Sequence, residues 1–251
     1  MFEFPLIRFD NRKWLEKLQE GDFYMRNCLY YQSLENDDEA RNDPYDGSLP
    51  FADINGVMKQ LSGKETKNQR LMLLDLFVKC FYCCDEADFV RISESMRKLM
   101  FSEKTKRAIR EFNVGSAMLI FSPTQFIKQV ESVCVSRKEP IAYDKVEYLD
   151  EKGYQCKRER LVDHPGECVR FPFYKDSRFS DQKEFRICVK HPLIQAEEQK
   201  SYLMLPKTIG NTPYSFDIGH IDDTCIVSIE NLLRNGIILD YNSQHYYVCE
   251  E

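Results

Sequence analysis

The sequence contains no long apolar run and little glycine, and each absence excludes a class of protein. No apolar run approaches the roughly 18 to 20 residues that a membrane-spanning helix needs. Glycine supplies only 10 of the 251 residues, and Gly63-Lys64 has no preceding glycine at the P-loop distance. The first ten residues, MFEFPLIRFD, have no basic region followed by an apolar core, so we expect no signal peptide. These absences predict a cytoplasmic protein without a glycine-rich phosphate loop.

Excess positive charge and metal-ligand spacing are also absent. The net charge is −6 and the isoelectric point about 5.4, so no overall basic field attracts nucleic acid. The ten cysteines are scattered, mostly within apolar runs, and we interpret them as small buried hydrophobic residues. Cys80-x-x-Cys83 has the spacing of half a zinc site, but neither a second such pair nor a suitably spaced histidine pair accompanies it. We therefore expect no metal.

The chain does contain a long series of short strand and helix patterns, without repeats or linker-like stretches. A hydrophobic content of 43% with 30% charged residues is typical of a soluble globular protein. We predict a single α+β domain over residues 1–251, with mixed or antiparallel sheets and several short helices. Predicted strands cover 2–9, 22–27, 77–84, 116–122, 142–151, 168–176, 184–191, 201–206, 225–229 and 245–250, with a hairpin within 49–61. Predicted helices cover 12–20, 93–112, 123–132 and 228–236, and a loop covers 35–48.

One predicted strand combines polar and apolar side chains in strict alternation. In QKEFRI (182–187), Gln182, Glu184 and Arg186 share one face, while Phe185 and Ile187 share the other. A solvated face of an antiparallel sheet has the same pattern. The alternative interpretation is a site, because a carboxylate fixed in a low-dielectric pocket stabilises the positive charge that develops when a glycosidic bond breaks.

This Gln182-x-Glu184 element resembles the Q/E-x-E element of ADP-ribosyltransferases. The resemblance implies that Glu184 is catalytic and that Gln182 orients the ribose or the acceptor. It also implies a basic residue for NAD on the first strand, for which Arg8 is the candidate. The family's middle strand ends in a Ser/Thr-rich element that supports the nicotinamide pocket; IFSPTQF (120–126) offers Ser122 there, although Pro123 departs from the pattern. NAD is then the substrate, and a protein side chain or a nucleic acid is the acceptor.

A second resemblance covers more of the chain. GDFYMRNCLYYQSLEND…RNDPYDG (21–47) and FPFYKD…FSDQKEFRI (171–187) look like a bacterial domain of unknown function, which has an early lyF…FNDPFE element and a late K…W.yE.EyR element. It supports the single-domain prediction and draws attention to Asn42, Asp43 and Asp46. We interpret these either as turn residues or as part of a loop that closes over the pocket of Glu184.

Aromatic residues precede that loop. Tyr30 and Tyr31 lie directly before its turn-rich polar stretch. They are our candidates for stacking on a ring of NAD, and packing in the core is the alternative role.

The favoured hypothesis is an NAD-binding ADP-ribosyltransferase-like enzyme, with a role as a toxin or phage-defence effector. Two rivals stay open. A metal-dependent nuclease would hold Mg²⁺ with Asp43, Asp46 and Glu184. A non-catalytic interaction module would bind a protein through the polar strand face. The sequence does not specify the acceptor or the oligomeric state.

Overall fold

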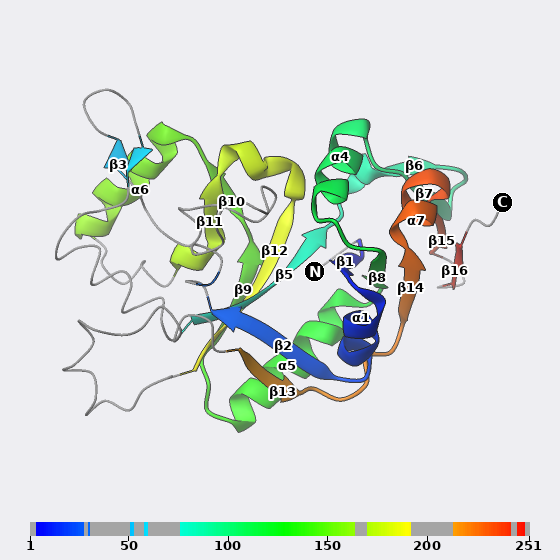
Figure 1. Ribbon diagram of the computed structural model, residues 1–251, viewed down its shortest axis with the longest axis horizontal. Helices are drawn as coiled ribbons and strands as arrows, with labels where there is room; N and C mark the ends of the chain where they lie inside the picture. The colour runs from blue at the N-terminus through cyan, green and yellow to red at the C-terminus, as the bar shows by residue number, and fades with distance from the viewer. Residues whose placement is uncertain are drawn as a thin grey trace.

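The computed structural model describes residues 4–27, 30, 51–52, 58–59, 76–163, 170–191, 213–241 and 245–248. Within them the fold is α+β, as predicted, with mainly antiparallel sheets and short helices (Figure 1). The main sheet contains β1 (Leu6–Asp10), β2 (Asp22–Asn27), β5 (Leu76–Cys83), β8 (Ser116–Ile120), β9 (Ile141–Lys145), β12 (Glu184–Lys190), β13 (Tyr214–Asp217) and β14 (Thr224–Ser228). The helices are α1 (Arg12–Gln19), α4 (Glu103–Glu111), α5 (Pro123–Ser136), α6 (Glu151–Asp163) and α7 (Ile229–Asn235), with 3-10 turns η1 (Glu86–Asp88) and η3 (Ser177–Gln182).

Three smaller sheets accompany the main one. β6 (Phe89–Arg91), β7 (Met96–Leu99), β15 (Ile237–Asp240) and β16 (His245–Val248) form an antiparallel sheet. β10 (Glu147–Leu149) and β11 (Tyr174–Asp176) pair in parallel, and β3 (Phe51–Ala52) pairs antiparallel with β4 (Met58–Lys59). No helix of the described residues is both long and apolar enough to span a membrane.

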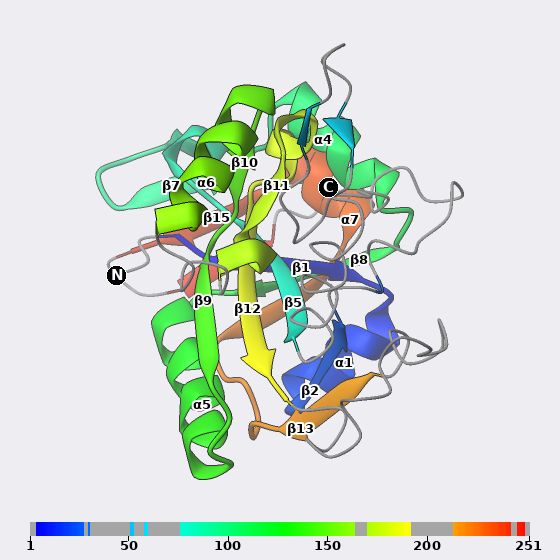
Figure 2. The ribbon, with the colours of Figure 1, turned by 90° about the vertical axis from the view of Figure 1, so that its left-hand side faces the viewer.

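The main sheet splits along β5. On one edge β12 pairs with the whole length of β5. On the other edge β2 pairs only with Phe77 and Val78, and β1 only with Tyr82 and Cys83. Among the strands described, none covers residues 79–81 on this second edge. Figure 2 shows β1 and β8 running across the direction of β9 and β12, so the sheet opens where β5 changes partner.

Apolar side chains cover both faces of the main sheet. On one face, α1 and α5 bury Leu15, Leu18 and Phe126 against Phe77 and Phe81 of β5. On the other face, α4, α7 and the β6–β7–β15–β16 sheet pack against β1 and β8. The segment of α6, β10 and β11 packs against β5 and β12. Burying one large apolar side chain stabilises a fold by roughly 1.5–3 kcal/mol, so these clusters fix the strands around the split.

Most predicted strands are confirmed, but the helix predicted at 93–112 is wrong in its first half. Met96–Leu99 is strand β7, because it pairs with both β6 and β15. The helix begins only after Ser102, whose side chain accepts a hydrogen bond from the backbone N–H of Thr105. The strand predicted at 142–151 is two strands, β9 and β10, and α6 follows it without having been predicted.

Helix α1 is found where the sequence predicts it and ends one residue earlier than predicted. Leu15 and Leu18 are buried, whereas Trp14 is 46% exposed. The ammonium groups of Lys13 and Lys17 lie 4.9 and 4.7 Å from the centre of its indole ring. The predicted elements at 35–48 and 201–206 lie outside the described residues.

Candidate functional site

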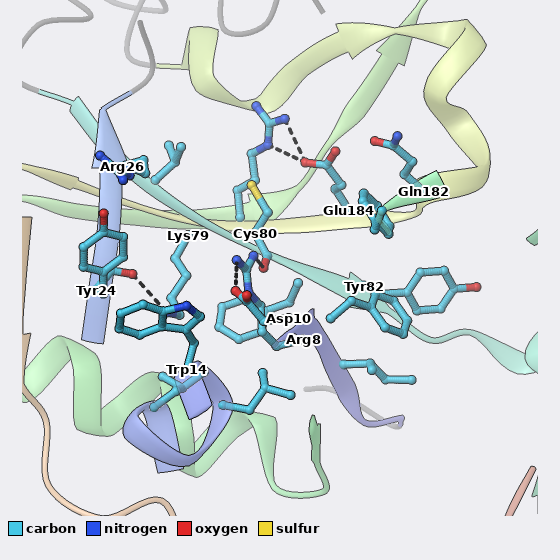
Figure 3. A pocket seen from close by; sticks show the side chains of 18 of the residues that line it. Arg8, Asp10, Trp14, Tyr24, Arg26, Lys79, Cys80, Tyr82, Gln182 and Glu184 are labelled. Atoms are coloured by element: carbon cyan, nitrogen blue, oxygen red, sulfur yellow. Dashed lines mark hydrogen bonds and ion pairs between the residues drawn. The ribbon is translucent and has the colours of Figure 1, made fainter. Parts of the chain in front are cut away.

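A cavity of about 420 Å³ lies where the main sheet splits (Figure 3). Its walls come from β1, α1, β2, β5, β11 and the η3–β12 turn. Four residues that the sequence predicts for a site line it together: Arg8, Tyr30, Gln182 and Glu184. The charged residues on its wall are Arg8, Lys17, Arg26, Lys79, Lys175, Arg186, Asp10, Asp22 and Glu184.

Two cationic side chains bond backbone groups beside the split. Arg8 donates from Nη1 to the carbonyl of Cys80 at 2.8 Å and from Nη2 to Asp10 at 2.9 Å. Lys79 donates from Nζ to the carbonyl of Tyr24 at 2.9 Å. A buried carbonyl without a donor costs about 1–3 kcal/mol. Arg8 and Lys79 therefore stabilise the open sheet as well as lining the cavity.

The η3–β12 turn corrects the prediction of one continuous polar strand face. Gln182 ends η3, Lys183 has left-handed backbone angles (φ 40°, ψ 50°), and β12 begins only at Glu184. The turn nevertheless brings the side chains of Gln182 and Glu184 together, because Lys175 Nζ donates to Gln182 Oε1 at 2.7 Å and to Glu184 Oε1 at 2.5 Å. Gln182 and Glu184 are 5% and 8% exposed, so this face is not a solvated one.

Two cations hold the Glu184 carboxylate. Lys175 binds Oε1, while Arg186 Nε and Nη2 each lie 2.8 Å from Oε2. Arg186 also donates from Nη1 to the carbonyl of Pro172 at 2.7 Å. Burial raises the pKa of Glu184, but the attraction of Arg186 and of Lys175 outweighs it and lowers that pKa to about 2. Glu184 is therefore an anion of fixed orientation at neutral pH.

An ion-pair cluster around Lys183 stabilises the η3–β12 turn. Lys183 Nζ lies 3.0 Å from both Asp85 and Asp88. The buried Asp88 carboxylate also accepts from the hydroxyl of Tyr82 at 2.8 Å and from the backbone N–H of Asp85 at 3.0 Å. The carbonyl of Lys183 accepts from the N–H of Cys83 at 2.8 Å. These contacts hold the left-handed residue that places Glu184.

Aromatic side chains occupy the opposite end of the cavity. Arg26 lies 5.2 Å from the ring centre of Tyr24 and 4.6 Å from that of Tyr30. Figure 3 shows Tyr24, Arg26 and Trp14 across the cavity from Glu184. Tyr30 lines the cavity, with Arg26 on its ring, while Tyr31 lies outside the described residues.

Ser122 differs from the prediction, because it does not join this wall. It precedes α5, and its hydroxyl donates to Asp223 at 2.5 Å, at the turn before β14. Its side chain forms no capping hydrogen bond to α5. The antiparallel register of β1 and β8 sets Ile120 opposite Leu6, so Ser122 lies beyond the start of β1 and away from Arg8.

Two of the three carboxylates predicted for a metal site, Asp43 and Asp46, lie outside the described residues, as does Asn42. Within the described residues, no three His, Cys, Asp or Glu side chains converge as metal ligands would. Cys80 also departs from its predicted place in the core, since it is half-buried and lines the cavity.

Sequence reasoning missed two lysines of the site, Lys79 and Lys175. Each is buried; Lys79 lies in a strand whose other residues are apolar or aromatic, whereas Lys175 lies between Tyr174 and Asp176 in β11. A lysine inside an apolar strand pattern, as in LFVKCFYC (76–83), is the signal that would have found Lys79.

The chain matches no protein-family model, no curated protein and no solved structure.

Proposed function

We propose that this cavity binds NAD and that the protein is an ADP-ribosyltransferase-like enzyme, which breaks the bond between nicotinamide and ribose. The observation that supports the proposal is the convergence of Arg8, Gln182 and Glu184 on one cavity. Arg8 is far from Gln182 and Glu184 in the sequence, and all three are predicted from a resemblance in short motifs alone. Its volume of about 420 Å³ is within the range of roughly 300–1,000 Å³ typical of small-molecule sites.

The charge state of Glu184 suits the proposed chemistry. Departure of nicotinamide leaves positive charge on the ribose, and a buried carboxylate stabilises that charge. Three donors already bind Glu184, one at Oε1 and two at Oε2. A carboxylate has about four lone-pair positions, which leaves room at Oε1 for a ribose hydroxyl. Lys175 and Arg186 would then orient the carboxylate, and Gln182 would share Lys175 with it.

Nicotinamide release is the direct test. Purified protein is incubated with NAD and cell lysate, and both nicotinamide and labelled ADP-ribose on protein or nucleic acid are measured. We expect release by the natural protein, its loss in Glu184→Gln, and no change in Glu111→Gln, an exposed residue at the end of α4. The label identifies the acceptor. The proposed role as a toxin or phage-defence effector requires that such an acceptor exists.

Folding of the variant needs a separate measurement, because Glu184→Gln leaves two buried cations without their counter-charge. Thermal unfolding of each variant supplies it. Absence of nicotinamide release from the folded natural protein, with no thermal shift on adding NAD, would contradict the proposal. The cavity would then be examined as the surface of a non-catalytic interaction module.

A further inference from the structure

Lys79 is a buried lysine on the cavity wall whose ammonium has an incomplete set of partners. The residue is 7% exposed. Its Nζ donates to the carbonyl of Tyr24 and lies 5.2 Å from the ring centre of Phe23, and no ion pair of the described residues includes it. An ammonium has three donors, so two N–H groups remain for a ligand. Figure 3 shows the side chain extending from β5 between Tyr24 and Trp14.

The charged groups around Lys79 leave its ammonium poorly compensated. Arg8 and Asp10 face it from β1, Asp22 from β2, and the thiol of Cys80 is its neighbour on β5. Asp10 is already paired with Arg8 at 2.9 Å. Burial, followed by the repulsion of Arg8, lowers the pKa of Lys79 to about 7 despite the two aspartates. Near neutral pH both the neutral and the charged form of Lys79 are therefore populated.

The described wall of the cavity carries more cationic than anionic side chains, although the chain is acidic. Its described wall carries the cations Arg8, Lys17, Arg26, Lys79, Lys175 and Arg186 against the anions Asp10, Asp22 and Glu184. The chain has a net charge of −6. A concave site of one sign concentrates ligands of the opposite sign, so the ligand that complements this wall is an anion.

We propose that Lys79, with Arg8 beside it, binds a phosphate group of the ligand and takes up a proton when that phosphate arrives. The ligand class is a pyrophosphate diester. That this diester belongs to NAD rests on the proposed function, whereas the phosphate site itself does not. Figure 3 shows Lys79 beside Tyr24 and Trp14, with Cys80 between it and Glu184, so the ribose would contact Glu184 while the phosphates contact Lys79.

The proton uptake follows from the missing counter-charge. A phosphate next to Nζ supplies an anion in direct contact, where among the described residues the hydrogen-bond acceptor is the carbonyl of Tyr24, so the charged form of Lys79 becomes favoured. Affinity then falls as the pH rises above 7, by up to about tenfold per unit, because the lysine must be protonated before it binds.

Isothermal titration calorimetry with ADP-ribose tests this proposal. The phosphates of ADP-ribose are diesters, so their charge is constant near neutral pH. Titrations at pH 7.5 in two buffers of different ionisation enthalpy report the number of protons taken up. We expect the natural protein to bind with net uptake of a fraction of a proton per ligand, and with smaller uptake at pH 6 than at pH 7.5. Lys79→Met should bind at least tenfold more weakly and without uptake.

Lys128→Met is the matched control, since it removes the same charge from an exposed position of α5 and should bind like the natural protein. Unchanged affinity in Lys79→Met, absence of proton uptake by the natural protein, or absence of ADP-ribose binding would each overturn the proposal. The uptake measurement needs no variant, so a folding defect of Lys79→Met leaves the proposal testable. If ADP-ribose binds with proton uptake but NAD is not turned over, only the transferase function is contradicted. If NAD is turned over equally by the natural protein and Lys79→Met, only the phosphate site is contradicted.

Discussion

Arg186 binds the carboxylate of Glu184, its neighbour two residues earlier on β12, through Nε and Nη2 at 2.8 Å each. Residues two apart in a strand share a face, and here that face is buried, with Arg186 2% and Glu184 8% exposed. Lys175 completes the cluster from β11. Because the cluster is buried, the charge of Glu184 affects the stability of the fold as well as the proposed reaction.

The first prediction concerns stability in acid. The folded pKa of Glu184, about 2, lies below its ordinary value of 4.5. The ionised group therefore contributes stability above about pH 4.5, and this contribution is lost as the pH falls toward 2; its full size is on the order of 3 kcal/mol. Urea unfolding at pH 7, 4.5 and 3 should show the natural protein losing more stability than Glu184→Gln. Parallel pH profiles of the two proteins would contradict this.

The second prediction separates charge balance from catalysis. Glu184→Gln alone should reduce the free energy of unfolding by about 3–5 kcal/mol, because Lys175 and Arg186 remain buried without their anion. Adding Lys175→Met removes one of these cations, so the double variant should regain part of that stability. Thermal unfolding measures the recovery.

Neither of these variants should release nicotinamide. Activity in the more stable double variant would show that Glu184 is not the anion that stabilises the ribose. The double variant also controls for unfolding, since loss of activity in a stable protein is not attributable to loss of the fold.

The third prediction concerns the brace of the turn. Asp88→Asn weakens the ion pair with Lys183 and the bonds to Tyr82 and to the backbone of Asp85. We expect a loss of about 2–4 kcal/mol in unfolding free energy, together with a lower kcat for nicotinamide release, since the turn that places Glu184 would shift. Glu86→Gln is the control, because Glu86 is exposed and its ion pair with Arg97 is long, with 3.8 Å between Oε1 of Glu86 and Nη1 of Arg97. If kcat were unchanged in Asp88→Asn, the brace would be structural only.

Local pattern predicted the strands that form the cavity, because each alternates or is continuously apolar. β5, β8 and β12 follow from the run of buried residues in each. Pattern failed at Met96–Leu99, whose strand state depends on β15, a partner from much later in the chain. The exposure of Trp14 depends on side-chain contacts of the same helix, since an aromatic residue is stable on the surface when two lysines cover its ring.

The candidate site was predictable only in part. The spacing of Gln182 and Glu184 drew attention to the correct turn, but a left-handed Lys183 has no sequence signature, since glycine or asparagine is the usual residue there. The roles of Lys79 and Lys175 depend on contacts with β2 and β12, which no local pattern contains. Ser122 is the opposite case. Its position after a middle strand matches the motif, but the register of β1 and β8 places it away from Arg8, where it bonds Asp223.

The last prediction tests whether the turn before β2 maintains the cavity. Gly21 has φ +108°, and a Cβ there would lie 2.6 Å from Asp217 Oδ1 and 2.8 Å from the carbonyl oxygen of Gly219. Gly21→Ala should therefore cost about 2 kcal/mol or more of unfolding free energy. It should also weaken ADP-ribose binding, because β2 begins at the next residue and supplies the cavity wall around Tyr24.

Gly115→Ala is the matched control, since no atom lies within 4 Å of the added Cβ. Its melting temperature and its affinity for ADP-ribose should equal those of the natural protein. If Gly21→Ala were as stable as this control and bound ADP-ribose equally well, the turn would tolerate a side chain, and the position of β2 would not depend on the left-handed glycine.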